Sequence, residues 1–216
     1  MTKRLSPTPK WINQSLQGIT YWIGHRRALY SGYALGESAL VAELCNMIYT
    51  HISSDHVLRC EVQYTELLPG DPEVTILASK ARVDIVVARK KDGKREGATP
   101  EFVIEVKRAS ASKAQIDNDL RRLAAVKKHH PNLTAYLIVI AEAERPKRFV
   151  DEKGVACSQV HQIPETSQLY RVRRVFKATH SFTSRDRAQY ACLVEISPAQ
   201  PRSRMRRAEP WKAKSS

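Results

Sequence analysis

The stretch ARVDIVVARKKDGKREGATPEFVIEVKRAS, residues 81–110, decides the fold of this chain. Its two runs rich in β-branched residues, 82–88 and 102–107, are joined by a charged connection that contains glycine, which is typical of two neighbouring strands. Three charged residues interrupt these apolar runs, namely Asp84, Glu105 and Lys107. Burying such groups costs free energy unless they are paired or bind a metal, so their position indicates a functional site.

The alternation of side chains along a strand places these three residues relative to one another. Glu105 and Lys107 share one face of the second strand. Asp84 is expected on the face opposite to Val83 and Ile85 in the first strand. If the two strands are neighbours, Asp84 and Glu105 come within reach of one metal ion, with Lys107 beside them.

A helix before these strands offers a further carboxylate. Apolar residues three and four apart predict helices over 11–30 and 36–52. Glu37 lies on the apolar face of the second helix and is expected to point toward the sheet. Glu43 lies about 120° round that helix from Glu37, at the edge of the apolar stripe. Which glutamate completes a site stays open, with Glu37 favoured.

The remaining segments predict an α/β fold. Alternating or continuously apolar runs predict strands, and a third amphipathic stretch predicts a helix. The strands are expected over 56–64, 74–79, 134–141, 170–178 and 190–197, and the helix over 114–129. This order of elements implies a central mixed β-sheet flanked by helices.

Composition favours a basic protein that binds a polyanion. Lysine and arginine outnumber aspartate and glutamate by 36 to 22, a formal charge of +14, and nucleic acid is the leading partner for such a surplus. The 42% hydrophobic content suits one packed core. We expect a helical extension over 1–35, one domain over 36–197 and a basic, disordered tail over 198–216.

Cysteine usage and the lack of long apolar runs favour a cytoplasmic protein. The four cysteines are widely spaced, with no C-x-x-C pair, so we expect buried thiols rather than a zinc site or a disulfide framework. No stretch reaches the length of a membrane span, and no apolar region follows the basic start of the chain. A cytoplasmic location is therefore expected.

Two carboxylates and a lysine together suit the hydrolysis of a phosphodiester bond. The hard carboxylate oxygens of Asp84 and Glu105, with a backbone carbonyl and water, favour Mg²⁺ or Mn²⁺ over zinc. A divalent cation can polarise a phosphoryl oxygen and lower the pKa of an attacking water. The ammonium group of Lys107 can orient that water or offset negative charge in the transition state.

These residues resemble the PD-(D/E)xK nucleases, whose fold is shared by many restriction endonucleases and repair nucleases. The resemblance covers residues 36–141 and rests on Asp84, a spacing of 21 residues, and then an E-V-K triplet; Val83 stands where the motif has proline. It implies a restriction-endonuclease-like core. The implied metal ligands are Asp84, Glu105 and the carbonyl of Val106, the implied catalytic lysine is Lys107, and Glu37 is a further catalytic or metal-binding carboxylate.

Several basic and polar residues are candidates for contacts with nucleic acid. In several branches of the family the helix after the lysine also lends a polar residue to the site, here Lys113 or Gln115. Basic residues that lie among aromatic ones or along a strand complete the set: Arg26, Arg27, Arg171 and Arg173.

The sequence therefore predicts a Mg²⁺-dependent endonuclease that hydrolyses DNA, with restriction or phage defence as its setting; RNA stays open as a substrate. The family often cuts both strands as dimers, so a homodimer is compatible with the resemblance. The competing hypothesis is a non-catalytic module that binds nucleic acid or a larger complex and keeps the nuclease fold.

Overall fold

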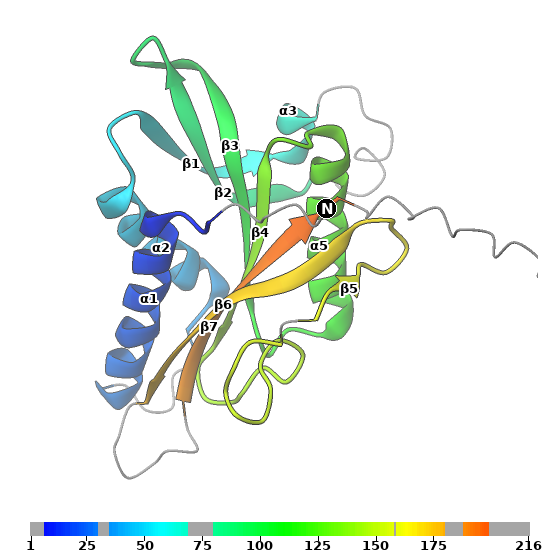
Figure 1. Cartoon of the computed structure of the whole chain (residues 1–216). Helices are drawn as coiled ribbons and strands as arrows, with labels where there is room; N and C mark the ends of the chain where they lie inside the picture. The colour runs from blue at the N-terminus through cyan, green and yellow to red at the C-terminus, as the bar shows by residue number, and fades with distance from the viewer. Residues whose placement is uncertain (1–6, 30–34, 69–79, 158, 180–187, 199–216) are drawn as a thin grey trace, which may run out of the picture.

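The structure is a computed structural model that describes residues 7–29, 35–68, 80–157, 159–179 and 188–198, apart from the side chains of Arg27, Ala28 and Thr179. The described chain forms helices and one sheet (Figure 1). The helices are α1 (Lys10–Leu29), α2 (Glu37–His51), α3 (Tyr64–Leu67) and α5 (Lys113–His129). The strands are β1 (His56–Gln63), β2 (Arg82–Lys91), β3 (Lys94–Arg108), β4 (Thr134–Ala141), β5 (His161–Gln162), β6 (Leu169–Thr179) and β7 (Ala188–Ser197).

The sheet has seven strands in the order β1-β2-β3-β4-β7-β6-β5. Only the β3–β4 pair is parallel among the described strands, and the other neighbours are antiparallel. A parallel pair needs a long crossover, which α5 supplies between β3 and β4. The predicted α/β fold with a mixed sheet flanked by helices is therefore confirmed.

The helices cover both faces of the sheet (Figure 1). Apolar residues of α1 and α2 pack with one face, and those of α5 pack with the other. Strand β4 lies between these two layers: Leu137 belongs to the cluster under α5, and its neighbour Ile138 belongs to the cluster under α1 and α2. Burial of both faces explains why the sequence of β4 is continuously apolar.

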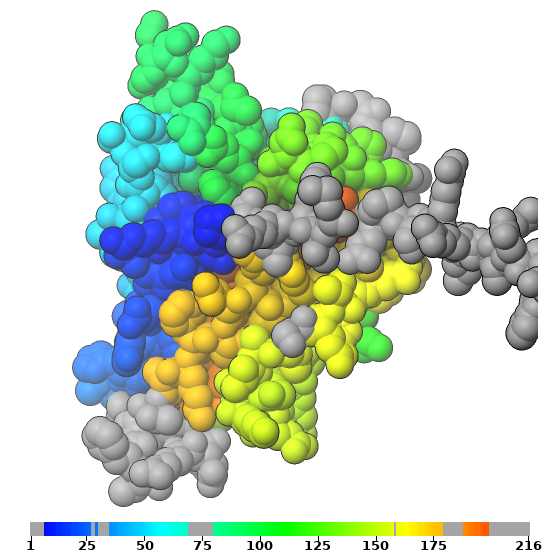
Figure 2. All heavy atoms as spheres, viewed as in Figure 1, coloured from blue at the N-terminus to red at the C-terminus, as the bar shows by residue number. Residues whose placement is uncertain are grey.

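Strands β2 and β3 form a hairpin whose turn is read directly from the sequence. Lys91 pairs with Lys94, and Asp92 and Gly93 between them have φ values of 50° and 72°. Positive φ at both positions is the conformation that an Asp-Gly pair favours in a two-residue hairpin. The tip projects beyond the rest of the described chain, as Figure 2 also shows.

Some predicted elements differ from the structure. The strand predicted over 56–64 ends at Gln63, and Tyr64 begins the short helix α3 instead. Strand β5 was not predicted within a stretch expected to be irregular. The strand expected over 74–79 and the tail beyond residue 198 lie outside the described residues.

The prediction of four buried thiols is wrong for three cysteines. Cys192 is buried, Cys45 and Cys157 are half-buried, and Cys60 is exposed. Cys60 lies on β1, an edge strand of the sheet. In the described ranges, no helix combines the length and the apolar character needed to cross a membrane.

Candidate active site

The candidate site lies where the pairing of β2 with β3 ends. The last paired residues are Ile85 and Ile104. Beyond them the backbone amide of Val106 donates to Oδ2 of Asp84 at 2.6 Å. The carboxylate of Asp84 therefore accepts a hydrogen bond from a β3 amide that is not used in pairing with β2. Asp84 is thereby held at the opening between the two strands.

The predicted alternation around Asp84 is wrong in one respect. Val83 packs in the cluster under α5, whereas Ile85 packs in the cluster under α1 and α2, so these two residues do not share a face. The pairing of β1 with β2 also leaves out Asp84. On β1, Glu61 is left out in the same way, between two paired residues, and it has a φ of 55°. An irregularity of this kind re-aims a side chain, and here it turns Asp84 toward β3.

Glu105 is the most buried carboxylate of the site, with 3% of its surface exposed. Burial raises the pKa of Glu105, and the carboxyl group of Asp84 lies close enough for its charge to raise this pKa further. The hydroxyl of Tyr64, buried at the start of α3, donates to Oε1 of Glu105. The two carboxyl groups therefore form one unit that protein donors hold from both sides.

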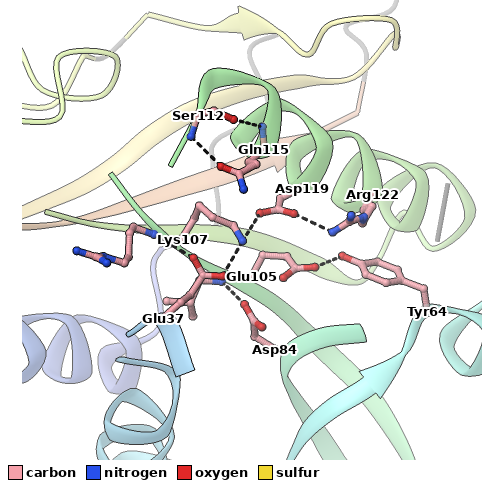
Figure 3. A network of polar contacts seen from close by, with 11 residues as sticks. Glu37, Tyr64, Asp84, Glu105, Lys107, Ser112, Gln115, Asp119 and Arg122 are labelled. Carbon is pink, nitrogen blue, oxygen red and sulfur yellow. Dashed lines mark hydrogen bonds and ion pairs between the residues drawn. The ribbon is translucent and has the colours of Figure 1, made fainter. Parts of the chain in front are cut away.

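Lys107, two residues after Glu105 on β3, joins two helices through their acidic side chains (Figure 3). Its Nζ lies 2.7 Å from Oε1 of Glu37, the first residue of α2, and 3.2 Å from Oδ2 of Asp119 on α5. The backbone amide of Arg108 also donates to Oε2 of Glu37, at 3.4 Å. Glu37 retains 36% exposure, against 17% for Lys107, so the site opens to solvent on the side of Glu37.

Asp119 and Tyr64 complete the network, and the sequence reasoning missed both. Asp119 is nearly fully buried and binds Arg122, with Oδ1 at 2.9 Å from Nη1. A signal was present: Asp119 lies three residues after Ile116 and four before Leu123, within the apolar stripe of its helix. Tyr64 carries no such signal, because the alternating residues before it predict the end of a strand at this position.

Burial and the closeness of the acidic groups shift their pKa values. Burial raises the pKa of Asp84 to about 6, although the Val106 amide opposes this shift. Burial, followed by the charges of Asp84 and Asp119, raises the pKa of Glu105 well above its usual value. Carboxyl groups with raised pKa values are a recurrent feature of functional sites.

Lys107 is held in its charged form. Burial lowers the pKa of Lys107, but the contacts with Glu37 and Asp119 outweigh burial and raise this pKa above its ordinary value. Burial also raises the pKa of Asp119, with the nearby Lys107 opposing the shift. The cation is therefore stabilised by the two acids it joins.

The residues fit Mg²⁺ only as a partial ligand set. Among the residues that the structure describes, no group of three or more His, Cys, Asp and Glu side chains is placed to hold a metal ion. Asp84 and Glu105 supply two adjoining carboxyl groups. Mg²⁺ commonly takes one or two carboxylates and completes its shell with water and substrate oxygens, so this pair suffices for it. The predicted role of the Val106 carbonyl stays a prediction.

Two alternatives left open by the sequence are separated by the structure. Glu37, and not Glu43, contacts Lys107; Glu43 is half-buried and accepts a hydrogen bond from Asn46 on its own helix, at 3.5 Å.

Gln115 forms a capping box with Ser112 at the start of α5: each residue's side chain accepts from the other's backbone amide, at 2.9 and 3.2 Å. The position of Gln115 is thus explained by helix capping.

Lys113 lines a cavity of about 650 Å³ beside the first turn of α5. The cavity is also lined by Arg148, His161 and Tyr170. The rings of His161 and Tyr170 stack with centroids 5.2 Å apart, and the Arg148 guanidinium lies 5.3 Å from the Tyr170 centroid. Tyr170 is buried and Arg148 forms an ion pair with Asp117 at 2.7 Å, whereas Lys113 is exposed and could meet a phosphate.

The remaining predicted contact residues lie on other elements. Arg26 of α1 lies over the ring of Trp22, at 5.5 Å, and the side chain of Arg27 is outside the described residues. Arg171 and Arg173 lie on β6, which β4 and β7 separate from β3. Arg173 forms an ion pair with Glu195 at 2.9 Å.

Comparisons of the chain with protein-family models, curated proteins and solved structures find no match. The resemblance to the PD-(D/E)xK nucleases therefore rests on the sequence of this chain and stays a prediction.

Proposed function

We propose that this protein is a Mg²⁺-dependent nuclease of the PD-(D/E)xK type, with a restriction-endonuclease-like core, that hydrolyses phosphodiester bonds of DNA. One observation carries the proposal. Asp84, Glu105 and Lys107 meet where β2 and β3 separate, and Glu37 reaches the same lysine from α2. The formal charge of +14 supports a polyanionic substrate.

Each residue has a distinct task in this proposal. Asp84 and Glu105 would hold the cation, which supplies polarisation of the phosphoryl oxygen and a more acidic attacking water. Lys107 places a positive charge beside the scissile phosphate and stabilises the negative charge that develops there. Glu37 and Asp119 hold the ammonium group of Lys107 in position, which makes Asp119 a positioning residue.

A cleavage panel tests the proposal. Purified protein is incubated with double-stranded, single-stranded and branched DNA and with RNA, in Mg²⁺, Mn²⁺ or chelator. We expect cleavage of DNA with either metal and none with chelator. Asp84→Ala and Lys107→Ala should abolish cleavage while nucleic-acid binding persists, and Lys153→Ala, an exposed lysine outside the network, should cut like the wild type. Unchanged cleavage by both site variants would refute the assignment.

A second candidate function is a nucleic-acid-binding module without catalysis. It is favoured by the closure of the polar network: Lys107 already has two carboxylate partners, and Glu105 accepts from the buried Tyr64 hydroxyl. A satisfied network of this kind can serve stability alone. Salt-dependent binding to DNA without metal-dependent cleavage of any substrate would select this function over the first.

A further inference from the structure

Two cysteines that are distant in the sequence meet at the edge of the sheet. The Sγ atoms of Cys45 on α2 and Cys60 on β1 lie 3.2 Å apart, although both residues are free thiols. In a disulfide the two sulfur atoms lie about 2.05 Å apart, so a shift of roughly 1 Å would bring these two within bonding distance. The pair lies outside the polar network of the candidate active site.

The pair is also accessible from solvent. Cys60 is exposed on the edge strand, whereas Cys45 is half-buried where α2 packs on the sheet. Burial and the neighbouring Cys60 sulfur raise the pKa of the Cys45 thiol. An oxidant from solvent therefore meets Cys60 first, and Cys45 is placed to resolve the product.

We propose that Cys45 and Cys60 are a site of reversible covalent modification, at which an intramolecular disulfide ties α2 to β1. A low-molecular-weight disulfide, such as glutathione disulfide, is the oxidant. The Cys60 thiolate attacks one sulfur of glutathione disulfide, and the first glutathione leaves as a thiolate. The Cys45 thiol then loses its proton to water as its sulfur attacks Sγ of Cys60, and the second glutathione leaves as a thiolate. Two protein thiols are oxidised, one disulfide is reduced to two glutathiones, and the protons of the thiols end on those products or in water.

The linkage would act on elements that flank the candidate active site. Cys60 pairs directly with Ile85 on β2, the residue next to Asp84, and α2 carries Glu37 at its first position. A bond between α2 and β1 holds the helix on the sheet, and it also restricts the unfolded chain. This inference does not depend on the proposed nuclease function, because it requires only the two thiols.

The test uses a background in which these are the only thiols. The full chain with Cys157→Ser and Cys192→Ala is treated with glutathione disulfide, and free thiols are counted under denaturing conditions. We expect the count to fall from two to none in a monomer that carries no glutathione. The unfolding temperature should rise by roughly 5 to 10 °C, and dithiothreitol should reverse both changes.

Cys60→Ser in the same background is the matched control. It keeps one thiol and should show no rise in the unfolding temperature. In the wild-type chain, trypsin cleaves after Arg59 and separates the two cysteines, so a disulfide-linked peptide pair identifies the bond even if the background variant does not fold. The proposal would be overturned by two bound glutathiones per chain, by a disulfide-linked dimer, or by two thiols that persist after the treatment.

Discussion

Asp84→Asn should make the protein more stable in the absence of metal while it removes the proposed activity. Asp84 is half-buried beside the fully buried carboxyl of Glu105, and the structure places no cation side chain in a direct ion pair with Asp84 among the described residues. Ionised Asp84 is therefore destabilising in the folded protein. An asparagine of nearly the same shape removes the charge and keeps an acceptor for the Val106 amide.

The magnitude follows from the pKa shift. Folding raises the pKa of Asp84 from 3.8 to about 6. At about 1.4 kcal/mol for each pKa unit, the ionised group costs roughly 3 kcal/mol in the folded state. The pKa of about 6 already includes the opposing effect of the hydrogen bond from Val106, so this cost is a net value. We expect Asp84→Asn to be about 3 kcal/mol more stable than the wild type at pH 8.

The sign of the pH dependence provides a sharper test. Between pH 4 and 6 the folded wild type retains a proton that the unfolded chain has lost, so its stability falls as the pH rises through this interval and then levels off. The advantage of Asp84→Asn should therefore be near zero at pH 4, grow up to about pH 6 and stay constant above it.

Urea unfolding in chelator at a series of pH values measures this difference. Asp55→Asn, an exposed aspartate at the turn before β1, is the matched control and should follow the wild type. A variant less stable than the wild type at pH 8, or a difference independent of pH, would refute the electrostatic reasoning. Adding Mg²⁺ tests the metal proposal separately: it should stabilise the wild type and leave Asp84→Asn unchanged.

Three further predictions address the lysine, the helix cap and the cavity. Glu37→Gln should lower the initial cleavage rate roughly tenfold, equivalent to about 1.4 kcal/mol, whereas Glu43→Gln on the same helix should not; equal rates would contradict the role of Glu37. Ser112→Ala should lower the free energy of unfolding by about 1 kcal/mol because α5 loses its capping box; an unchanged urea midpoint would argue against this. Lys113→Ala should weaken DNA binding and reduce the slope of log affinity against log salt by about one in fluorescence anisotropy, whereas Lys153→Ala, outside the cavity, should bind like the wild type.

Local periodicity was enough to predict most elements. The apolar stripes of α1, α2 and α5 follow the helical period, and the Asp92-Gly93 turn follows from the φ values that these two residues favour. The same reasoning failed around Asp84 because the strand is irregular there. It failed for Tyr64 because the residue expected to end a strand is the first residue of the short helix α3.

The sequence by itself determined the three long helices and most strands, the mixed α/β architecture and the three charged residues of the β2–β3 hairpin. These features depend on residues that are close in the chain and on a fixed period of two or 3.6 residues. Only the tertiary structure decided which partners reach those charges: Glu37 is 70 residues from Lys107, and Tyr64 is 41 residues from Glu105. Such contacts depend on how helices pack on the sheet, and the meeting of Cys45 with Cys60 has the same origin.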